Sequence, residues 1–338
     1  MTMKKITAFL LTVLMLLSLT ACAEKSASTN LFAMDTYMSL TAYGSNAQTA
    51  LTDASRRINE LERMLSRTVA QSDVSKLNET RRAAVSDETA ALLGDALQYA
   101  VKTDGAFDMT IAPIVNAWGI TSDTPRVPDS DEIAALLTHV GSSHVHLDGN
   151  TVTLDEGCAI DLGGIAKGYA SDCVASIFAD YGITSGCVSL GGNVYVCGNK
   201  PDGDKWLVAI QDPQGDGYAA MVALSDAFAV TSGGYQRYFT AEDGTVYQHI
   251  IDPKTGYPVQ SDLLSVTVIA DNGTMADAYS TALYVMGERG AIDFWRANAD
   301  RFDVVMITTD GRLLYTPNLQ DQITEPEGTT YDFQVIDR

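Results

Sequence analysis

The sequence predicts an α+β fold in which mixed sheets pack against helices. Segments with helical periodicity and segments with strand-like alternation both occur, but they do not follow the regular strand–helix–strand order of a doubly wound sheet. Between 186 and 239 the pattern changes to short strands separated by glycine and Asp-Gly turns. With 46% hydrophobic residues, the chain can bury a substantial core. We therefore expect one large domain after an N-terminal leader.

The expected elements of the first half follow from local periodicity and capping signals. Ser86, followed by Asp87 and Glu88, is a plausible N-cap, and Gly105 lies just beyond the end of the same helix. An Asp-Gly-Asn turn at 148–150 predicts a hairpin. In order, we expect a strand over 31–42, helices over 51–65, 86–104 and 133–137, and a hairpin of 144–147 with 151–154.

In the second half the same reasoning predicts a helix that opens at a glycine turn and runs to about Tyr181. Gly287 stands where it would end a later helix, and Asp310-Gly311 predicts a final hairpin. The expected elements are strands over 207–211, 221–224 and 265–270, a helix over 275–286, and strands over 303–308 and 313–315.

The N-terminus has the features of a bacterial lipoprotein signal. Lys4 and Lys5 precede an apolar run over 6–19, and Leu-Thr-Ala-Cys22 follows where a signal peptidase would cut. The run, of about 15 residues, is shorter than the roughly 20 residues that span a bilayer. We expect a signal peptide over 1–21, a lipidated Cys22 on a flexible tether over 22–30, and a single domain over 31–338. The protein would then be exported and lipid-anchored, facing the extracytoplasmic side of the membrane.

The formal net charge of −21 argues against a nucleic-acid partner and against electrostatic docking on anionic lipid, because both require basic patches. The remaining cysteines lack the C-x-x-C spacing of zinc or redox sites and are interpreted as small core residues. Export would permit a disulfide between Cys187 and Cys197, but the sequence does not establish one. The four cysteines after Cys22 are Cys158, Cys173, Cys187 and Cys197.

A glycine-rich turn, Asp161-Leu-Gly-Gly-Ile-Ala-Lys167-Gly, opens the helix predicted to end near Tyr181. Paired glycines let the backbone approach a ligand, and the helix N-terminus offers free N–H groups and a positive dipole end. Such a turn suits a pyrophosphate. An ordinary strand-to-helix connection explains the turn equally well, so it needs partners elsewhere in the chain.

Asp277 and Thr281 stand four residues apart on a predicted helix and therefore share one face. A carboxylate and a hydroxyl there are suitable ligands for a hard cation such as Mg²⁺, which usually takes few protein ligands and completes its shell with waters and phosphates. The alternative is structural, because an acid in a first helical turn offsets the dipole and a buried threonine simply packs.

His249 is the best candidate for a general base. His249 and Asp252 lie three residues apart, before a Pro-Lys-Thr-Gly turn, and either side chain could take a proton from a substrate hydroxyl. Asp252 before a proline is also a common turn opener. His144 and His146 would share one strand face and resemble a metal pair, although a solvated strand face explains them as well.

Taken in order, the motifs of this chain resemble the ApbE family of bacterial FAD:protein FMN transferases, over 32–306. The resemblance rests on the whole ordered set, which is Met34-Asp-Thr36, Gly105-Ala-Phe-Asp108, Val115-Asn-Ala-Trp118-Gly119, the turn from Asp161 to Gly168, Ser189-Leu-Gly-Gly-Asn193, Thr231-Ser-Gly233, His249-Ile-Ile-Asp252-Pro-Lys-Thr-Gly256 and Ala276-Asp277-Ala-Tyr-Ser-Thr281.

The resemblance implies a T-fold-like α+β domain with a flavin-binding cleft. It implies transfer of the FMN half of FAD to a threonine or serine of another exported protein, such as a subunit of a membrane redox complex, with release of AMP. Mg²⁺ would lie between the Gly164 carbonyl and the side chains of Asp277 and Thr281. The residues implied to contact FAD are Met34, Ala106, Phe107, Asp108, Asp161, Lys167 and the Ile251 backbone.

Three positions depart from the family pattern. Asp35 replaces a usual glycine, Thr68 stands where many members have a flavin-stacking tyrosine, and Ser280 stands where some have a further aspartate. Asp35 and Thr68 do not touch the metal or pyrophosphate residues, so for them we expect altered flavin affinity before any loss of chemistry. Ser280 replaces a fourth metal ligand that some members of the family have. Two other functions remain open at this point: a Mg²⁺-dependent FAD pyrophosphatase that yields FMN and AMP, and a non-catalytic flavin-binding lipoprotein.

Overall fold

The computed structural model describes residues 25–338. The predicted signal peptide and Cys22 lie outside these residues. A nine-stranded sheet forms the centre of the fold, and all of its neighbouring strands are antiparallel except β15 and β17. In spatial order the strands are β1 (Ser26–Ala33), β2 (Thr36–Tyr43), β6 (Ser185–Leu190), β7 (Asn193–Gly198), β10 (Ala227–Gly233), β13 (Leu263–Ala270), β14 (Asp303–Thr308), β15 (Arg312–Tyr315) and β17 (Asp332–Val335).

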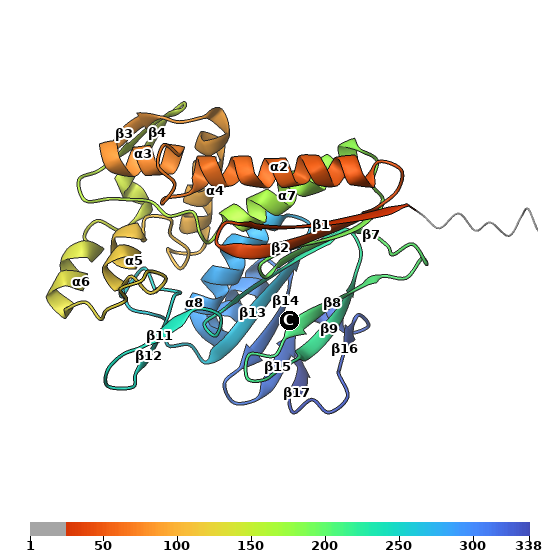
Figure 1. Cartoon of the computed structure of the whole chain (residues 1–338). Coiled ribbons are helices and arrows are strands. Elements are labelled where there is room, and N and C mark those ends of the chain that lie inside the picture. Colours follow the sequence, from red (N-terminus) through yellow and green to blue (C-terminus); the bar gives the residue numbers. More distant parts are fainter. Residues whose placement is uncertain (1–24) are drawn as a thin grey trace, which may run out of the picture.

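Three long helices cover one face of this sheet: α2 (Ala47–Leu65), α7 (Ala166–Asp180) and α8 (Gly273–Ala297). Figure 1 shows α2 and α7 above the strands β1 and β2. The apolar positions of α2 recur at helical spacing, and Leu51, Ile58 and Leu61 are completely buried. This helical layer and the sheet share the main hydrophobic core.

A small antiparallel sheet covers part of the other face. Its strands are β8 (Trp206–Gln211), β9 (Tyr218–Leu224) and β16 (Ile323–Thr324). Strand β14 shows how the two cores divide: Val304 and Met306 face the helices, while Val305 and Ile307 face the small sheet. This alternation follows from the two-residue period of a strand. The predicted α+β class with mixed sheets is confirmed.

The remaining elements form a smaller lobe and several edge pieces (Figure 1). The elements of the lobe and of these edge pieces are α3 (Asp73–Thr80), β3 (Arg82–Ala84), α4 (Asp87–Lys102), α5 (Ala112–Trp118), α6 (Ser130–Leu137), η1 (Ser142–His144), β4 (Val145–Asp148), β5 (Thr151–Leu154), β11 (Tyr238–Thr240), β12 (Val246–Gln248) and η2 (Pro317–Leu319). As predicted, Ser86 caps α4, since its side chain accepts the Thr89 N–H.

The N-terminal prediction is wrong in two respects. The segment 31–42 is not one strand, because the chain reverses at Met34 and Asp35 and forms the hairpin of β1 and β2. The predicted tether over 22–30 is also too long, since Ser26 already pairs with Tyr43. Polar composition suggested a flexible segment, but pairing with β2 supplies the backbone hydrogen bonds that order it.

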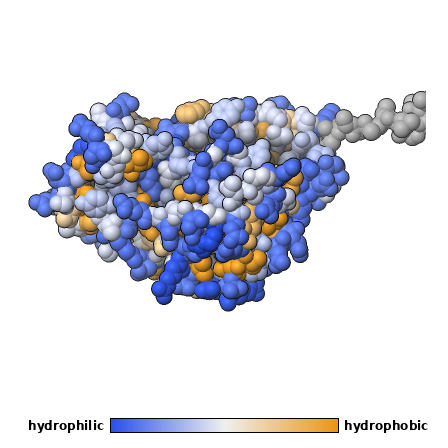
Figure 2. Space-filling view, turned by 90° about the horizontal axis from the view of Figure 1, so that it is seen from below, coloured by the Kyte–Doolittle hydropathy of each residue, from blue (hydrophilic) through white to orange (hydrophobic). Residues whose placement is uncertain are grey.

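Helix α8 continues further than predicted. Gly287, with φ 72° and ψ 177°, breaks the helix at the expected position, but the chain re-enters a helix and runs on to Ala297. Within residues 25–338, no helix has the length and apolar character required to cross a membrane. The face of the molecule seen from below is mostly hydrophilic, with separate hydrophobic patches (Figure 2).

The β1–β2 turn leads to a stability prediction. Met34 and Asp35 both have positive φ values, 50° and 56°, as the central residues of a type I′ turn do. Glycine is favoured at the second position because an L side chain is strained there. We expect Asp35→Gly to raise the free energy of unfolding by about 0.5–1 kcal/mol, measured by urea denaturation. Asp35→Ala is the control and should lower it; a less stable glycine variant would contradict the strain argument.

Candidate active site

The predicted site segments meet at one end of the nine-stranded sheet. A β-carbon on Gly191, in the β6–β7 turn, would lie 2.1 Å from Thr36 Oγ1, so this turn touches the start of β2. The Thr231 N–H of β10 donates to the Gly192 carbonyl over 3.1 Å. Ser232, next along β10, shares a 3.2 Å hydrogen bond with Thr281 Oγ1 of α8. The β6–β7 turn, the start of β2, the end of β10 and one face of α8 therefore surround one place.

Asp277 joins α8 to α7. Its side chain is 4% exposed, and its Oδ2 accepts the Gly168 N–H over 2.8 Å. Gly168 permits this contact because a β-carbon there would lie 2.2 Å from the Gly273 carbonyl oxygen. The absence of a side chain thus lets the two helices come close enough for the carboxylate to meet the backbone of the glycine turn.

Gly164 lies against both Thr281 and the Ala106-Phe107-Asp108 loop. A β-carbon on Gly164 would lie 3.6 Å from Thr281 Oγ1 and 3.2 Å from the Phe107 ring. The Asp161 N–H also donates to the Met109 carbonyl over 2.7 Å, which fixes the start of the glycine turn beside this loop. The predicted metal ligands Gly164, Asp277 and Thr281 therefore converge, although more than a hundred residues separate them.

The donor set fits a hard divalent cation. It combines one carboxylate, one hydroxyl and one main-chain carbonyl, the oxygen ligands that Mg²⁺ prefers. In the described part of the chain, Asp277 Oδ1 accepts no hydrogen bond, and it is not one of the fully buried atoms that lack a partner. This oxygen is therefore free to contact a cation or a water.

This donor set contains only one acidic side chain. Between residues 25 and 338, no three His, Cys, Asp or Glu side chains gather in a metal-binding group. Ser280 is completely buried, and its hydroxyl is occupied by the Asp277 carbonyl at 2.9 Å and by Ser232 at 2.8 Å. Waters and substrate phosphates would have to supply the remaining ligands of a bound Mg²⁺.

Asp161 lies between the Arg67 side chain and the glycine turn. Its Oδ2 is 2.8 Å from Arg67 Nε, and its Oδ1 accepts the Gly163 N–H over 2.8 Å. Arg67 also donates to Asn116 Oδ1 over 2.5 Å. Lys167 Nζ lies 3.4 Å from the Gly163 carbonyl oxygen. Arg67 neutralises the Asp161 carboxylate, and Lys167 adds a positive charge at the turn that is predicted to hold pyrophosphate.

The Ala106-Phe107-Asp108 loop is buried and internally braced. Thr103 Oγ1 accepts the Phe107 N–H over 3.2 Å, and Asp108 Oδ1 accepts both the N–H and the hydroxyl of Thr110. Burial raises the pKa of Asp108, against the effect of these hydrogen bonds. The Asp108 side chain thus closes a turn, while the Phe107 ring of the loop lies against Gly164.

His249 has the protonation state of a general base. Its Nδ1 lies 3.2 Å from the Arg237 carbonyl oxygen, which can only accept, so Nδ1 carries the proton and Nε2 keeps its lone pair. Desolvation, aided by the positive charges of Arg237 and Lys167, lowers the pKa of His249 to about 4. The imidazole is therefore neutral at physiological pH and can accept a proton at Nε2.

Asp252 is less suited to that role. Its Oδ1 accepts the Lys254 N–H over 2.9 Å, and its Oδ2 accepts the Thr255 hydroxyl over 3.1 Å. Both oxygens thus stabilise the Pro-Lys-Thr-Gly turn. This turn lies beside the smaller lobe, because the Trp118 indole donates to the Gly256 carbonyl over 2.8 Å.

Two further predicted FAD contacts lie at the mouth of the site. Ile251 is buried and pairs with Pro258 through an isolated bridge, which leaves its backbone at the end of the turn. The Met34 N–H donates to Glu62 Oε1 over 2.7 Å, and Arg237 donates to the Asp35 carbonyl over 2.6 Å. Arg237 thereby links the β1–β2 turn to the His249 segment.

The other groups weighed from the sequence have different surroundings. His144 Nδ1 and His146 Nε2 contact the two oxygens of Asp155, at 3.1 and 2.9 Å. Cys187 and Cys197 are free thiols on neighbouring strands. Burial raises the pKa of both thiols, so neither is an activated nucleophile.

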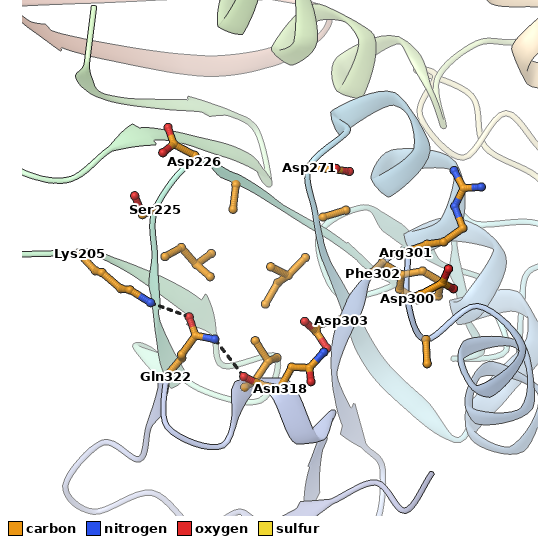
Figure 3. Close-up of a pocket in the computed structure, with 16 residues that line it drawn as sticks. Lys205, Ser225, Asp226, Asp271, Asp300, Arg301, Phe302, Asp303, Asn318 and Gln322 are labelled. Carbon is orange, nitrogen blue, oxygen red and sulfur yellow. Dashed lines mark hydrogen bonds between the residues drawn. The ribbon is translucent and has the colours of Figure 1, made fainter.

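A separate hollow of about 290 Å³ lies at the opposite end of the sheet (Figure 3). Its lining includes Asp226, Asp271, Asp303 and Lys205, and Lys205 donates a hydrogen bond to Gln322. Strand β10 begins here at Ala227 and reaches Ser232 five residues later, roughly 16 Å away at the rise of a strand. None of the predicted site residues lines this hollow.

Comparison with known proteins gives a consistent result. The model of the ApbE family matches residues 34–306. The FAD:protein FMN transferase of Vibrio cholerae is 33% identical over 274 residues, covering 79% of this chain and 82% of that protein. The FAD:protein FMN transferase of Treponema pallidum is 36% identical over 252 residues and covers 69% of each chain.

Solved structures extend the likeness to the whole described fold. The crystal structure of the ApbE protein from Thermotoga maritima has a TM-score of 0.81 and 32% identity, and covers 90% of this chain and 100% of that one. The flavin transferase ApbE of Vibrio cholerae has a TM-score of 0.76 and 29% identity, with 90% and 97% covered. The fold and the related proteins together show the class of this protein, which is a transferase. Within that class it belongs to the ApbE family.

Sequence reasoning missed several contributors to the site. Arg67 carries no motif of its own, and only the fold places it against Asp161. Gly168 was part of the glycine turn, but its contact with Asp277 depends on how α7 and α8 cross. Ser232 belongs to the Thr231-Ser-Gly233 motif, which was a usable signal, yet its hydrogen bond to Thr281 depends on how β10 packs against α8.

Proposed function

We propose that this protein transfers the FMN half of FAD to the hydroxyl of a threonine or serine on another exported protein and releases AMP. The observation that carries the proposal is the convergence of Gly164, Asp277 and Thr281 beside the glycine turn. A passive flavin-binding protein would not require a buried cation site there. The names of the relatives supply the substrate class.

The reaction can be assigned to residues of this chain. The acceptor oxygen forms a bond to the FMN phosphorus, and the bond from that phosphorus to the AMP oxygen breaks. His249 Nε2 takes the proton of the hydroxyl, since its lone pair is free at neutral pH. Lys167 and the N–H groups at the start of α7 hold the pyrophosphate oxygens.

A cation held by Gly164, Asp277 and Thr281 would neutralise the charge that develops on the pyrophosphate. Met34, the Ala106-Phe107-Asp108 loop, Asp161 and the Ile251 backbone would position the FAD. Such a site derives its rate from positioning and from charge neutralisation. Thr68 supplies no aromatic ring, so we expect the flavin to be held mainly by the loop and the turn.

One experiment separates this function from its two alternatives. The soluble domain is incubated with FAD, Mg²⁺ and the exported-protein fraction of the source cells, and AMP and covalent flavin are both followed. AMP together with flavinylated protein supports transfer. AMP with free FMN supports a pyrophosphatase instead, and bound FAD without AMP supports a binding protein. Omitting Mg²⁺ tests the metal requirement in the same assay.

We further propose that the protein acts outside the cytoplasm, anchored through a lipidated Cys22. The proposal rests on the leader sequence alone, and Cys22 precedes the described residues. Cells grown with radiolabelled palmitate should label the wild-type protein and leave Cys22→Ser unlabelled. Equal labelling of both proteins, or none of either, would remove the lipid anchor.

A further inference from the structure

Several exposed hydrophobic side chains belong to the segments that carry candidate site residues. Ten large hydrophobic residues are exposed within residues 25–338, and five of them belong to segments that frame the site. We call these five the rim: Phe32, Tyr37, Tyr238, Val246 and Tyr257. Scattered exposed hydrophobics are ordinary, but a group of mainly aromatic residues at one place is typical of a protein-binding surface.

The most exposed members of the rim form a pair. Phe32, 71% exposed, lies directly opposite Tyr37, 64% exposed, in the register of β1 and β2. Both lie within three residues of the Met34–Asp35 turn. The Arg237 side chain bonds that turn at the Asp35 carbonyl, which brings the start of β11 to it.

The other members follow from that connection. Tyr238 directly succeeds Arg237 and begins β11, and Val246 begins β12, which leads to His249 within three residues. Tyr257 belongs to the Pro-Lys-Thr-Gly turn and packs its ring 5.8 Å from that of Trp118. The rim thus follows the same segments that carry the proposed base and one of the proposed FAD contacts.

Strand β1 adds an open sheet edge to this surface. It is the outermost strand of the nine-stranded sheet, and it pairs only with β2 among the described strands. Natural edge strands are usually protected by lysine, by proline or by a bulge. The sequence of β1, SASTNLFA, contains neither a charge nor a proline, and its pairing with β2 is regular throughout. An extended segment of another protein can therefore pair with it.

We propose that the rim and the free edge of β1 are the docking surface for the acceptor protein. An extended acceptor segment with apolar side chains pairs along β1, contacts Phe32 and Tyr37, and brings its threonine or serine hydroxyl to the site end of the strand. This inference rests on the proposed function, because a macromolecular acceptor must bind within reach of the reacting phosphorus.

The test compares Phe32→Ser/Tyr37→Ser with wild type. Both side chains are exposed, so the fold should be retained, which thermal unfolding checks. The matched control is Leu207→Ser/Tyr218→Ser, which removes two large exposed hydrophobic side chains, 57% and 59% exposed, from β8 and β9. The acceptor is the exported-protein fraction of the source cells, and covalent flavin is read as fluorescence on a denaturing gel.

We expect the rim variant to lose about tenfold or more of its rate of protein flavinylation, as replacement of two interface aromatic residues should. FAD affinity and any AMP release without acceptor should change less than about twofold, because neither residue is assigned to FAD binding. The control variant should label acceptor at the wild-type rate.

Several outcomes would overturn the inference. Wild-type labelling by the rim variant shows that the acceptor docks elsewhere. Unchanged labelling combined with loss of a dimer in sedimentation assigns the rim to a second copy of the chain. Unchanged labelling combined with loss of binding to phosphatidylglycerol vesicles assigns it to the membrane. If wild type itself labels no protein, the proposed function fails, and this inference fails with it.

Discussion

Replacement of Asp277 by alanine should abolish Mg²⁺-dependent flavin transfer. The Asp277 carboxylate is the only acidic group of the proposed cation site, and Gly164 and Thr281 supply only neutral oxygens. Loss of the cation would forfeit several kcal/mol of charge stabilisation in the transition state, which corresponds to a rate lower by about 1,000-fold or more. The measurement is the initial rate of AMP release across a Mg²⁺ titration.

Two further variants isolate the metal effect from a structural one. Asp277→Asn keeps an acceptor for the Gly168 N–H but removes the negative charge, so it should fold like wild type and still be inactive. Asp293→Ala, an exposed aspartate later on the same helix, should keep full activity. An active Asp277→Asn variant with an unchanged Mg²⁺ dependence would show that the carboxylate is not a metal ligand.

Replacement of His249 by alanine should slow transfer by about 100- to 10,000-fold, the usual contribution of a general base. FAD binding should persist, because His249 is assigned to the acceptor proton and not to the flavin. His249→Gln is the companion variant, since glutamine preserves a donor to the Arg237 carbonyl. Both variants should lose turnover while FAD affinity, followed by flavin fluorescence, stays within about threefold.

The pH dependence of wild type provides an independent check on His249. Because the pKa of His249 is lowered to about 4, the imidazole remains neutral as the pH falls from 8 to 5. The transfer rate should therefore not fall through protonation of His249 as the pH is lowered from 8 to 5. An ordinary histidine would begin to lose its basic form near pH 6.5. A rate that falls sharply between pH 7 and pH 6 would show that another group acts as the base.

The structure also separates His249 from Asp252, which the sequence left open as an alternative base. The Asp252 carboxylate stabilises its own turn through Lys254 and Thr255. His249 offers an unshared lone pair at Nε2 instead. Their separation of three residues along the chain does not show which of them is the base. Only the observed hydrogen bonds assign them different roles.

Elements with strong local signals were predicted correctly. The Ser86 cap defined the start of α4, the Asp-Gly-Asn turn defined the β4–β5 hairpin, and Gly287 marked the break in α8. Each signal lies within a few residues of the structure it determines. The β1–β2 turn was not predicted, because Met34 and Asp35 are unusual turn residues and nothing local interrupted the strand pattern.

The sequence by itself determined the α+β class through its pattern of helical and strand segments, and it determined the family and the list of candidate residues through its ordered motifs. Tertiary structure alone decided how those residues meet: Gly168 against Asp277, Arg67 against Asp161, and Arg237 between the first hairpin and His249. The physical reason is separation along the chain. Contacts between segments about a hundred or more residues apart arise from helix crossing and strand order, which leave no periodic trace in either segment.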